Sequence, residues 1–177
     1  MRSFLLIACA LMAFVSCKKK VQDDNIIVDK VVTKKIEANQ RMEDSEQNGS
    51  FQWIKGMSYR YTIQRTASDS LAHVVNHDIP YSDNSITLSI KREDGSIFFT
   101  KTFTKENFSP VLPKQFMESG VLLSMSFNKT VDNEAFFVVS VGSPDENNEE
   151  FCYAQLVIDN FGNTHAEAYN DEMERGM

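Results

Sequence analysis

The sequence is short of cysteine, of long hydrophobic runs and of positive charge. It contains three cysteines in 177 residues, too few for the disulfide frameworks that stabilise small secreted domains. Apart from one apolar stretch near the beginning, no run approaches the roughly 20 residues that a membrane-spanning helix needs. The net charge is −7 and the lysines are dispersed, so we expect no nucleic-acid partner.

The one apolar stretch, Phe4–Val15, follows Arg2 and ends at the small residue Ser16, which is the pattern of a secretory signal peptide. Cys17 comes directly after it. This order resembles the lipobox of bacterial lipoproteins, in which the cysteine becomes the acylated N-terminus. Phe14 stands where the usual lipobox has leucine, and a plain signal peptide followed by a chance cysteine is the alternative. The resemblance implies lipidation of Cys17 by palmitate-type acyl chains.

The expected location follows from the anchor and its surroundings. More than one acyl chain holds a protein stably on a bilayer, so a membrane is the first partner that the sequence predicts. Lys18, Lys19 and Lys20 favour contact with anionic headgroups. Lipoproteins of the outer cell surface often have acidic residues at this place instead. We therefore expect a cell-envelope protein, anchored in the outer membrane and facing the periplasm.

Composition divides the chain into four parts. Residues 1–16 form the signal peptide, and residues 17–50 form the lipid anchor and a polar tether. Within this tether, residues 26–36 are rich in β-branched side chains and predict a possible edge strand. A single β domain is expected over 51–169, and a charged tail over 170–177.

Period-two alternation dominates the third part. Met57, Tyr59, Tyr61 and Ile63 alternate with polar residues, which predicts a strand with one wet face. Asp94-Gly95 is a strong hairpin signal. Strands are expected over 57–64, 71–75, 86–91, 97–104, 121–127, 135–141, 151–158 and 164–169.

Two segments break this pattern. Residues 78–85 contain Pro80 and predict a turn or loop. Pro110 and Pro113 prevent one long helix across residues 105–119, and we expect a single short helical insertion there. Sequential short-linked strands usually pair antiparallel. The sequence therefore predicts a mainly β fold, an antiparallel meander of about eight strands that forms a lipocalin-like flattened barrel, with a two-layer β-sandwich as the alternative.

A set of short runs is distributed over most of the chain: Arg41-Met42, Trp53, Tyr59, Arg65, Asp69-Ser70-Leu71, residues 81–88, residues 94–105 and Ser143-Pro144. In these runs the sequence resembles a family of Bacteroidales lipoproteins of unknown function. The resemblance covers residues 41–169 and implies an outer-membrane or periplasmic lipoprotein, with no catalytic or binding residue to carry over.

The polar residues give no pattern of known chemistry. No Gly-x-Ser-x-Gly elbow accompanies His73, His77 or His165. On a strand, His73 and His77 would lie about 13 Å apart, too far for one metal ion. The acidic residues between Asp145 and Glu150 lack the spacing and the glycine of a calcium loop and predict a solvated hairpin tip. We therefore predict no catalytic residue, no metal and no cofactor.

Four residues remain as candidates for ligand binding. Trp53, Tyr59 and Tyr61 are amphipathic and suit the lining of a sugar or lipid pocket, and Arg65 beside them suits an anionic group. The alternative is that the three aromatics seal one end of a barrel. Cys152, the thiol that remains in the mature chain, alternates within a strand and predicts a small buried hydrophobe.

These observations support three functional hypotheses. The first is a non-catalytic binding module for a small amphipathic ligand or an envelope protein. The second is a structural or interaction component of the envelope without a ligand pocket, which a filled core and an exposed apolar patch would favour. The third, an envelope hydrolase, has the least support because no catalytic constellation is visible.

Overall fold

A computed structural model describes residues 39–145 and 147–170. The expected signal peptide, the lipidation site Cys17, the possible strand at 26–36 and most of the charged tail lie outside the described residues. None of the described helices is long and apolar enough to cross a membrane. The strands are β1 (Ser45–Trp53), β2 (Met57–Ala67), β3 (His73–Asn76), β4 (Ile79–Ser82), β5 (Asn84–Arg92), β6 (Ile97–Phe103), β7 (Val121–Val131), β8 (Glu134–Gly142), β9 (Phe151–Asp159) and β10 (Thr164–Ala168). The helical turns are η1 (Ile54–Gly56), η2 (Lys105–Phe108) and α1 (Lys114–Ser119).

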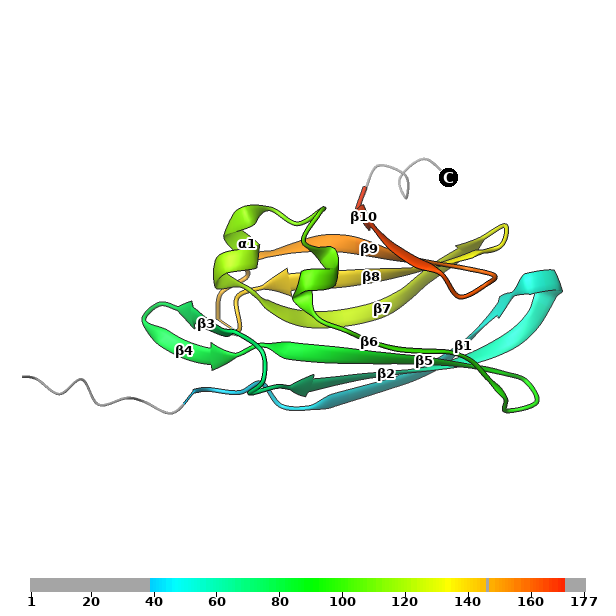
Figure 1. Ribbon diagram of the computed structural model, residues 1–177, viewed down its shortest axis with the longest axis horizontal. Helices are drawn as coiled ribbons and strands as arrows, with labels where there is room; N and C mark the ends of the chain where they lie inside the picture. Colours follow the sequence, from blue (N-terminus) through cyan, green and yellow to red (C-terminus); the bar gives the residue numbers. More distant parts are fainter. Residues whose placement is uncertain (1–38, 146, 171–177) are drawn as a thin grey trace, which may run out of the picture. The chain divides into compact units, whose positions relative to one another are not determined.

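The strands form two four-stranded antiparallel sheets, in the orders β1-β2-β5-β6 and β10-β9-β8-β7, and a separate β3-β4 hairpin. Figure 1 shows the two larger sheets as stacked layers, with helix α1 and the β3-β4 hairpin near one end. Two turns at the other end have the same construction. In each, a glycine at φ +85° takes the left-handed conformation that closes a three-residue hairpin loop, as Gly95 between β5 and β6 and Gly162 between β9 and β10.

The mainly β, antiparallel prediction and the helical insertion are confirmed, but the barrel prediction is wrong. In the part of the chain that the structure describes, no strand pair joins the two larger sheets. The chain leaves the first sheet at Phe103 and passes through η2 and α1 before it enters the second at Val121. Where β6 approaches β10, the sheets meet through side chains instead of a ladder of backbone bonds, as where Lys101 Nζ donates to Thr164 Oγ1 at 2.8 Å. The result is the two-layer sandwich.

The turn expected at residues 78–85 is shorter than predicted. His77 and Asp78 have positive φ and alone make the turn between β3 and β4. Pro80 lies within β4, opposite Val75. Proline has no backbone N–H, and a strand accepts it at a position where that N–H would not bond to the neighbouring strand. The composition of this segment indicates a loop, but tertiary pairing makes it a strand.

The β domain also begins earlier than residue 51. Strand β1 starts at Ser45 and pairs along its whole length with β2. Its first half contains few apolar residues because residues 45–48 are exposed on both faces of the strand. Gly49, on the inner side, lies beneath the ring of Tyr61. A Cβ at Gly49 would clash with that ring. The polar composition that indicated a tether is therefore that of an edge strand.

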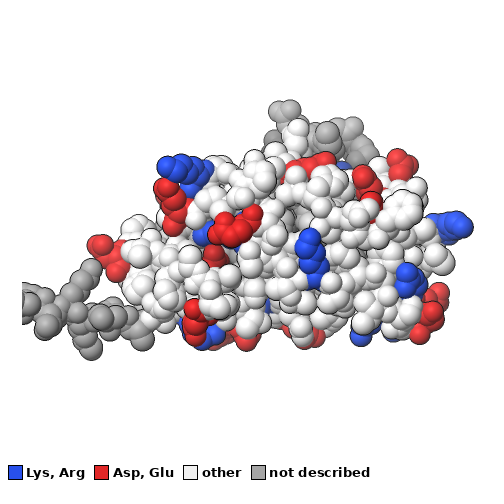
Figure 2. All heavy atoms as spheres, viewed as in Figure 1, with Lys and Arg blue, Asp and Glu red and all other residues white. Residues whose placement is uncertain are grey.

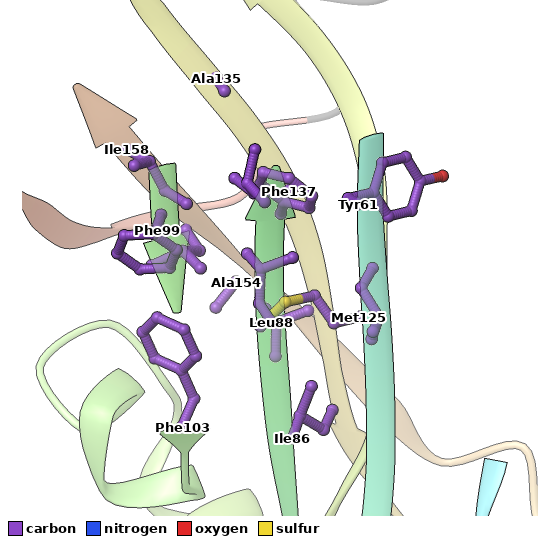
Figure 3. Packing of buried hydrophobic residues seen from close by; sticks show 14 of the residues in the cluster. Tyr61, Ile86, Leu88, Phe99, Phe103, Met125, Ala135, Phe137, Ala154 and Ile158 are labelled. Atoms are coloured by element: carbon purple, nitrogen blue, oxygen red, sulfur yellow. The ribbon is translucent and has the colours of Figure 1, made fainter. Parts of the chain in front are cut away.

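The core lies between the two sheets. Figure 3 shows side chains of both layers pointing toward one another, among them Leu88 and Phe137. Both are fully buried, and burial of each such side chain stabilises the fold by roughly 1.5–3 kcal/mol. The aromatic residues of β1 and β2 belong to the same cluster.

A buried ion pair connects the sheets at the end near α1. The Asp83 and Lys105 side chains are 6% and 5% exposed, and Oδ2 lies 3.3 Å from Nζ. Asp83 Oδ1 also accepts the backbone N–H of Asn84 at 2.7 Å and of Leu122 at 2.8 Å, while Lys105 Nζ donates to the Gly120 carbonyl. The start of β5, the start of η2 and the start of β7 therefore share one cluster of charge-assisted hydrogen bonds.

Replacing Lys105 by Met is expected to lower the free energy of unfolding by about 3–5 kcal/mol, because the Asp83 charge would stay buried without its partner. Adding Asp83→Asn should recover part of this loss, since the amide keeps an acceptor oxygen without the charge. Urea denaturation measures both. Lys114→Met is the matched control: its i,i+4 partner is Glu118, both side chains are exposed, and a change within about 0.5 kcal/mol is expected. Equal effects of the two Lys→Met substitutions would contradict the assigned role of the buried pair.

Candidate functional site

Three of the four predicted ligand-binding residues lie in the core. Trp53 and Tyr59 are 3% and 2% exposed, and Tyr61 is also buried. The ring centroid of Trp53 lies 5.4 Å from that of Tyr59 and 5.2 Å from that of Phe98. These contacts make the aromatics part of the packing between the sheets, and their role in ligand binding stays a prediction.

The fourth, Arg65, lies apart from them in a groove of about 480 Å³ at the end of the domain where the described chain begins. Its Nη1 donates to the carbonyl of Leu123 and its Nη2 to that of Glu43, both at 2.6 Å. The guanidinium of Arg65, on β2, therefore connects the segment around Glu43 to β7. Glu43, Asp44 and Asp145 line the same groove, so its charge does not suit an anionic ligand.

The histidines and the acidic loop lie in separate places. Asn39 Nδ2 is within 3.1 Å of both ring nitrogens of His73, His77 occupies a turn, and His165 Nε2 lies 3.0 Å from Glu167. Hydrogen bonds from the backbone and the side chain of Asn147 lower the pKa of Asp145. No group of three or more His, Cys, Asp or Glu residues able to hold a metal occurs within 39–145 and 147–170. A further small cavity, of about 120 Å³, lies beside the Asp83–Lys105 pair.

The outer face of the first sheet is polar throughout β1, β2 and β5. Cross-strand hydrogen bonds connect its side chains, for example Thr62 to Asn48 at 2.6 Å and Gln64 to Glu46 at 2.8 Å. Such a face is typical of a solvated sheet surface. Its outward residues are Glu46, Asn48, Ser50, Gln52, Ser58, Arg60, Thr62, Gln64, Thr66, Ser85, Thr87, Ser89 and Lys91.

The outer face of the second sheet is different. Phe151 and Tyr153 point outward from β9 and are 46% and 45% exposed. Their ring centroids are 5.3 Å apart, and the Tyr153 ring lies 5.4 Å from that of Tyr169. We call these three residues the outer aromatic row. Half-buried Phe136 and Val138 of β8 continue the apolar character of this face.

A groove of about 230 Å³ lies on the same sheet and is called the outer groove below. Its lining comes from all four strands and from the residues that follow β10: Asn128, Lys129, Val131, Phe136, Gln155, Glu167, Ala168, Tyr169 and Asn170. Tyr169 belongs to both the row and the groove, so the two are continuous. Over the side of the domain seen in Figure 2, acidic and basic side chains are interspersed without an area of one sign.

This surface was not predicted from the sequence. Alternation predicts a strand over 151–158 but indicates no role for its outward residues. The alternation was readable, because Ala154, Leu156 and Ile158 form the buried side and leave Phe151 and Tyr153 on the other. Large aromatic residues at Phe151 and Tyr153 alternate with the residues of the buried side. This pattern is the signal in the sequence that could have indicated an exposed aromatic site.

Cys152 lies on the inner side of β9, partly buried against the core. Burial raises the pKa of its thiol above the ordinary value. The folded state therefore binds a proton more tightly than the unfolded state, so this group's contribution to stability is present at neutral pH and is lost as the pH rises through the raised pKa.

The Cys152 thiol is accordingly expected to react with iodoacetamide at pH 8.5 several-fold more slowly in the folded protein than in urea, since the thiolate is the nucleophile. Peptide-level mass spectrometry separates Cys152 from other thiols. In the same assay, an exposed thiol introduced by Thr66→Cys should react at similar rates in both states. Equal rates for Cys152 in both states would contradict the assigned burial.

Comparison with known proteins gives one family. Residues 24–165 match a domain of unknown function, DUF4738. No curated protein matches the chain. The family match covers most of the sequence, including the whole of the first large sheet and the second sheet as far as the first two residues of β10.

Proposed function

The chain belongs to the DUF4738 family, whose function is unknown, and we propose that it is a non-catalytic, lipid-anchored binding module of the bacterial cell envelope. In this proposal it binds its partner on the outer face of the β10-β9-β8-β7 sheet rather than inside the domain. The observation that carries the proposal is the contrast between the two outer faces. That of the first sheet is polar across β1, β2 and β5, whereas that of the second has an exposed aromatic row.

Burial of the interior aromatics supports a surface site. Trp53, Tyr59 and Tyr61 already contact other rings, so a ligand between the sheets would have to displace them from a close-packed core. By contrast, Phe151 and Tyr153 keep nearly half of their surface exposed. Exposed aromatic residues of this kind are enriched at binding surfaces because they bury a large apolar area when a partner binds.

The non-catalytic part of the proposal rests on what the polar side chains do. Asp83 and Lys105 are enclosed and hydrogen-bonded to backbone, and Arg65 binds two carbonyl groups. His165 and Glu167 contact each other on the surface. Each of these groups therefore has a structural partner, which leaves little support for a hydrolase.

The location rests on the sequence before residue 39. The apolar stretch, Ser16 and Cys17 support a lipid anchor, and the three lysines that follow support the outer membrane facing the periplasm. About 21 residues separate Cys17 from Asn39, and an extended chain of that length reaches up to roughly 70 Å. Such a tether would let the outer aromatic row reach partners well away from the bilayer.

Cys17→Ser should move the protein from the membrane fraction to the soluble envelope fraction, because acylation needs the thiol. Fractionation and labelling with an alkyne fatty acid follow the change. Cys152→Ser is the matched control and should stay membrane-bound and labelled. A Cys17→Ser protein that remains labelled would overturn the anchor.

Binding on the outer face is tested by a photoreactive residue in intact cells. Tyr153→p-benzoylphenylalanine should give a discrete adduct, and Thr87→p-benzoylphenylalanine, on the polar outer face, should not. A second substitution, Phe151→Ser, should remove the adduct at position 153, because it takes away the neighbouring ring of the row. Identical adducts at both positions, or none at 153, would overturn the proposed surface.

A further inference from the structure

The outer groove crosses the sheet instead of following one strand. Lys129 of β7 lies opposite Phe136 of β8, and Gln155 of β9 lies opposite Glu167 of β10. All four line the groove. Three spacings between neighbouring strands give the groove a length of about 14 Å, which suits a short linear ligand better than a single compact one.

The polar lining is balanced in charge and rich in amides. Asn128 and Gln155 each provide two N–H donors and a carbonyl acceptor. Lys129 adds donors, and Glu167 adds acceptor oxygens, one of which lies 3.0 Å from His165. One cation and one carboxylate leave no net attraction for a polyanion such as a nucleic acid. This combination of close donors and acceptors matches a ligand that carries many hydroxyl groups.

The apolar lining provides flat surfaces beside these polar groups. Phe136 lies in the groove, and Tyr169 connects it to Tyr153 and Phe151. Aromatic rings offer an apolar face to which C–H groups pack, and tyrosine rings combine this face with a polar hydroxyl at one end. Pyranose rings have this dual character, since their axial C–H groups form an apolar face and their hydroxyls project around the edge.

We propose that the outer groove and the outer aromatic row bind a neutral oligosaccharide. The sugar rings pack against the outer aromatic row and Phe136, and their hydroxyls exchange hydrogen bonds with Gln155, Asn128 and Lys129. The inference rests on the proposed function, because it names the class of ligand for the same surface. A protein partner would use the exposed rings but has less need of an amide-lined groove, so it is one of the outcomes of the test.

The test is affinity electrophoresis of the full acylated protein in detergent, in native gels that contain neutral polysaccharides of differing linkage, with an anionic polysaccharide alongside. At least one neutral polysaccharide should retard the protein. Gln155→Ala and Tyr153→Ala should each weaken the retardation by about tenfold, the loss expected for a good hydrogen bond or a packed ring. Gln64→Ala is the matched control on the opposite outer face and should leave binding unchanged. Thermal melting verifies that all variants are folded.

Each contrary result has a definite meaning. Retardation that persists in both Gln155→Ala and Tyr153→Ala would place any sugar binding elsewhere and overturn the inference. Retardation by the anionic polysaccharide alone, lost in Lys129→Gln, would overturn the neutral class. If no polysaccharide retards the protein while the photoreactive residue at 153 captures a protein, the inference fails and the proposed function stands. If position 153 captures nothing either, both fail.

Discussion

The Asp83 carboxylate is the constraint on which the arrangement of the two sheets depends. It lies where β5 begins, and it accepts the N–H of Leu122, where β7 begins. Lys105 approaches the same carboxylate and donates to Gly120, so the passage from the first sheet to the second is fixed at both ends. Apolar packing between the sheets is non-directional, but these bonds have defined partners and set how β5 and β7 meet.

The cluster is completed by neighbouring polar groups. Asn84 Nδ2 donates to the Leu122 carbonyl at 2.8 Å, and Ser82 Oγ donates to Asp69 at 2.8 Å. Burying an ion pair costs desolvation free energy. The attraction between the charges offsets this cost only when the remaining donors and acceptors of the pair are also hydrogen-bonded. Here the Asp83 carboxylate has three polar contacts, and Ser82, Asp83 and Asn84 are all buried. The charged pair itself is therefore satisfied, whereas the neighbouring Asn84 Oδ1 is buried without a hydrogen-bond partner among the described residues. The cluster thus favours one docking of the layers, in which Phe151 and Tyr153 are exposed on the outer face of β9.

The fold class could be predicted because alternation is local. Met57 to Ile63 and Ile86 to Ile90 show period two in the sequence, and both segments are strands. Whether the sheet closes is not local. Closure depends on how β6 and β10 approach each other, and these strands are about 60 residues apart in the sequence, so a barrel and a sandwich give the same alternation. The start of β1 at Ser45 could not be predicted either, because the exposed part of an edge strand has the same polar composition as a tether.

The sequence by itself determined the mainly β class, the hairpin at Asp94-Gly95, the helical interruption before β7 and the absence of any disulfide framework. Each follows from residue types and from spacings of a few positions. Only the tertiary structure decided which aromatics are enclosed. Trp53 and Tyr59 are amphipathic in sequence yet lie in the core, whereas Phe151 and Tyr153 are exposed on the outer face of β9. The physical reason is that alternation assigns residues to two faces, but only the packing of one sheet on another determines which face is buried.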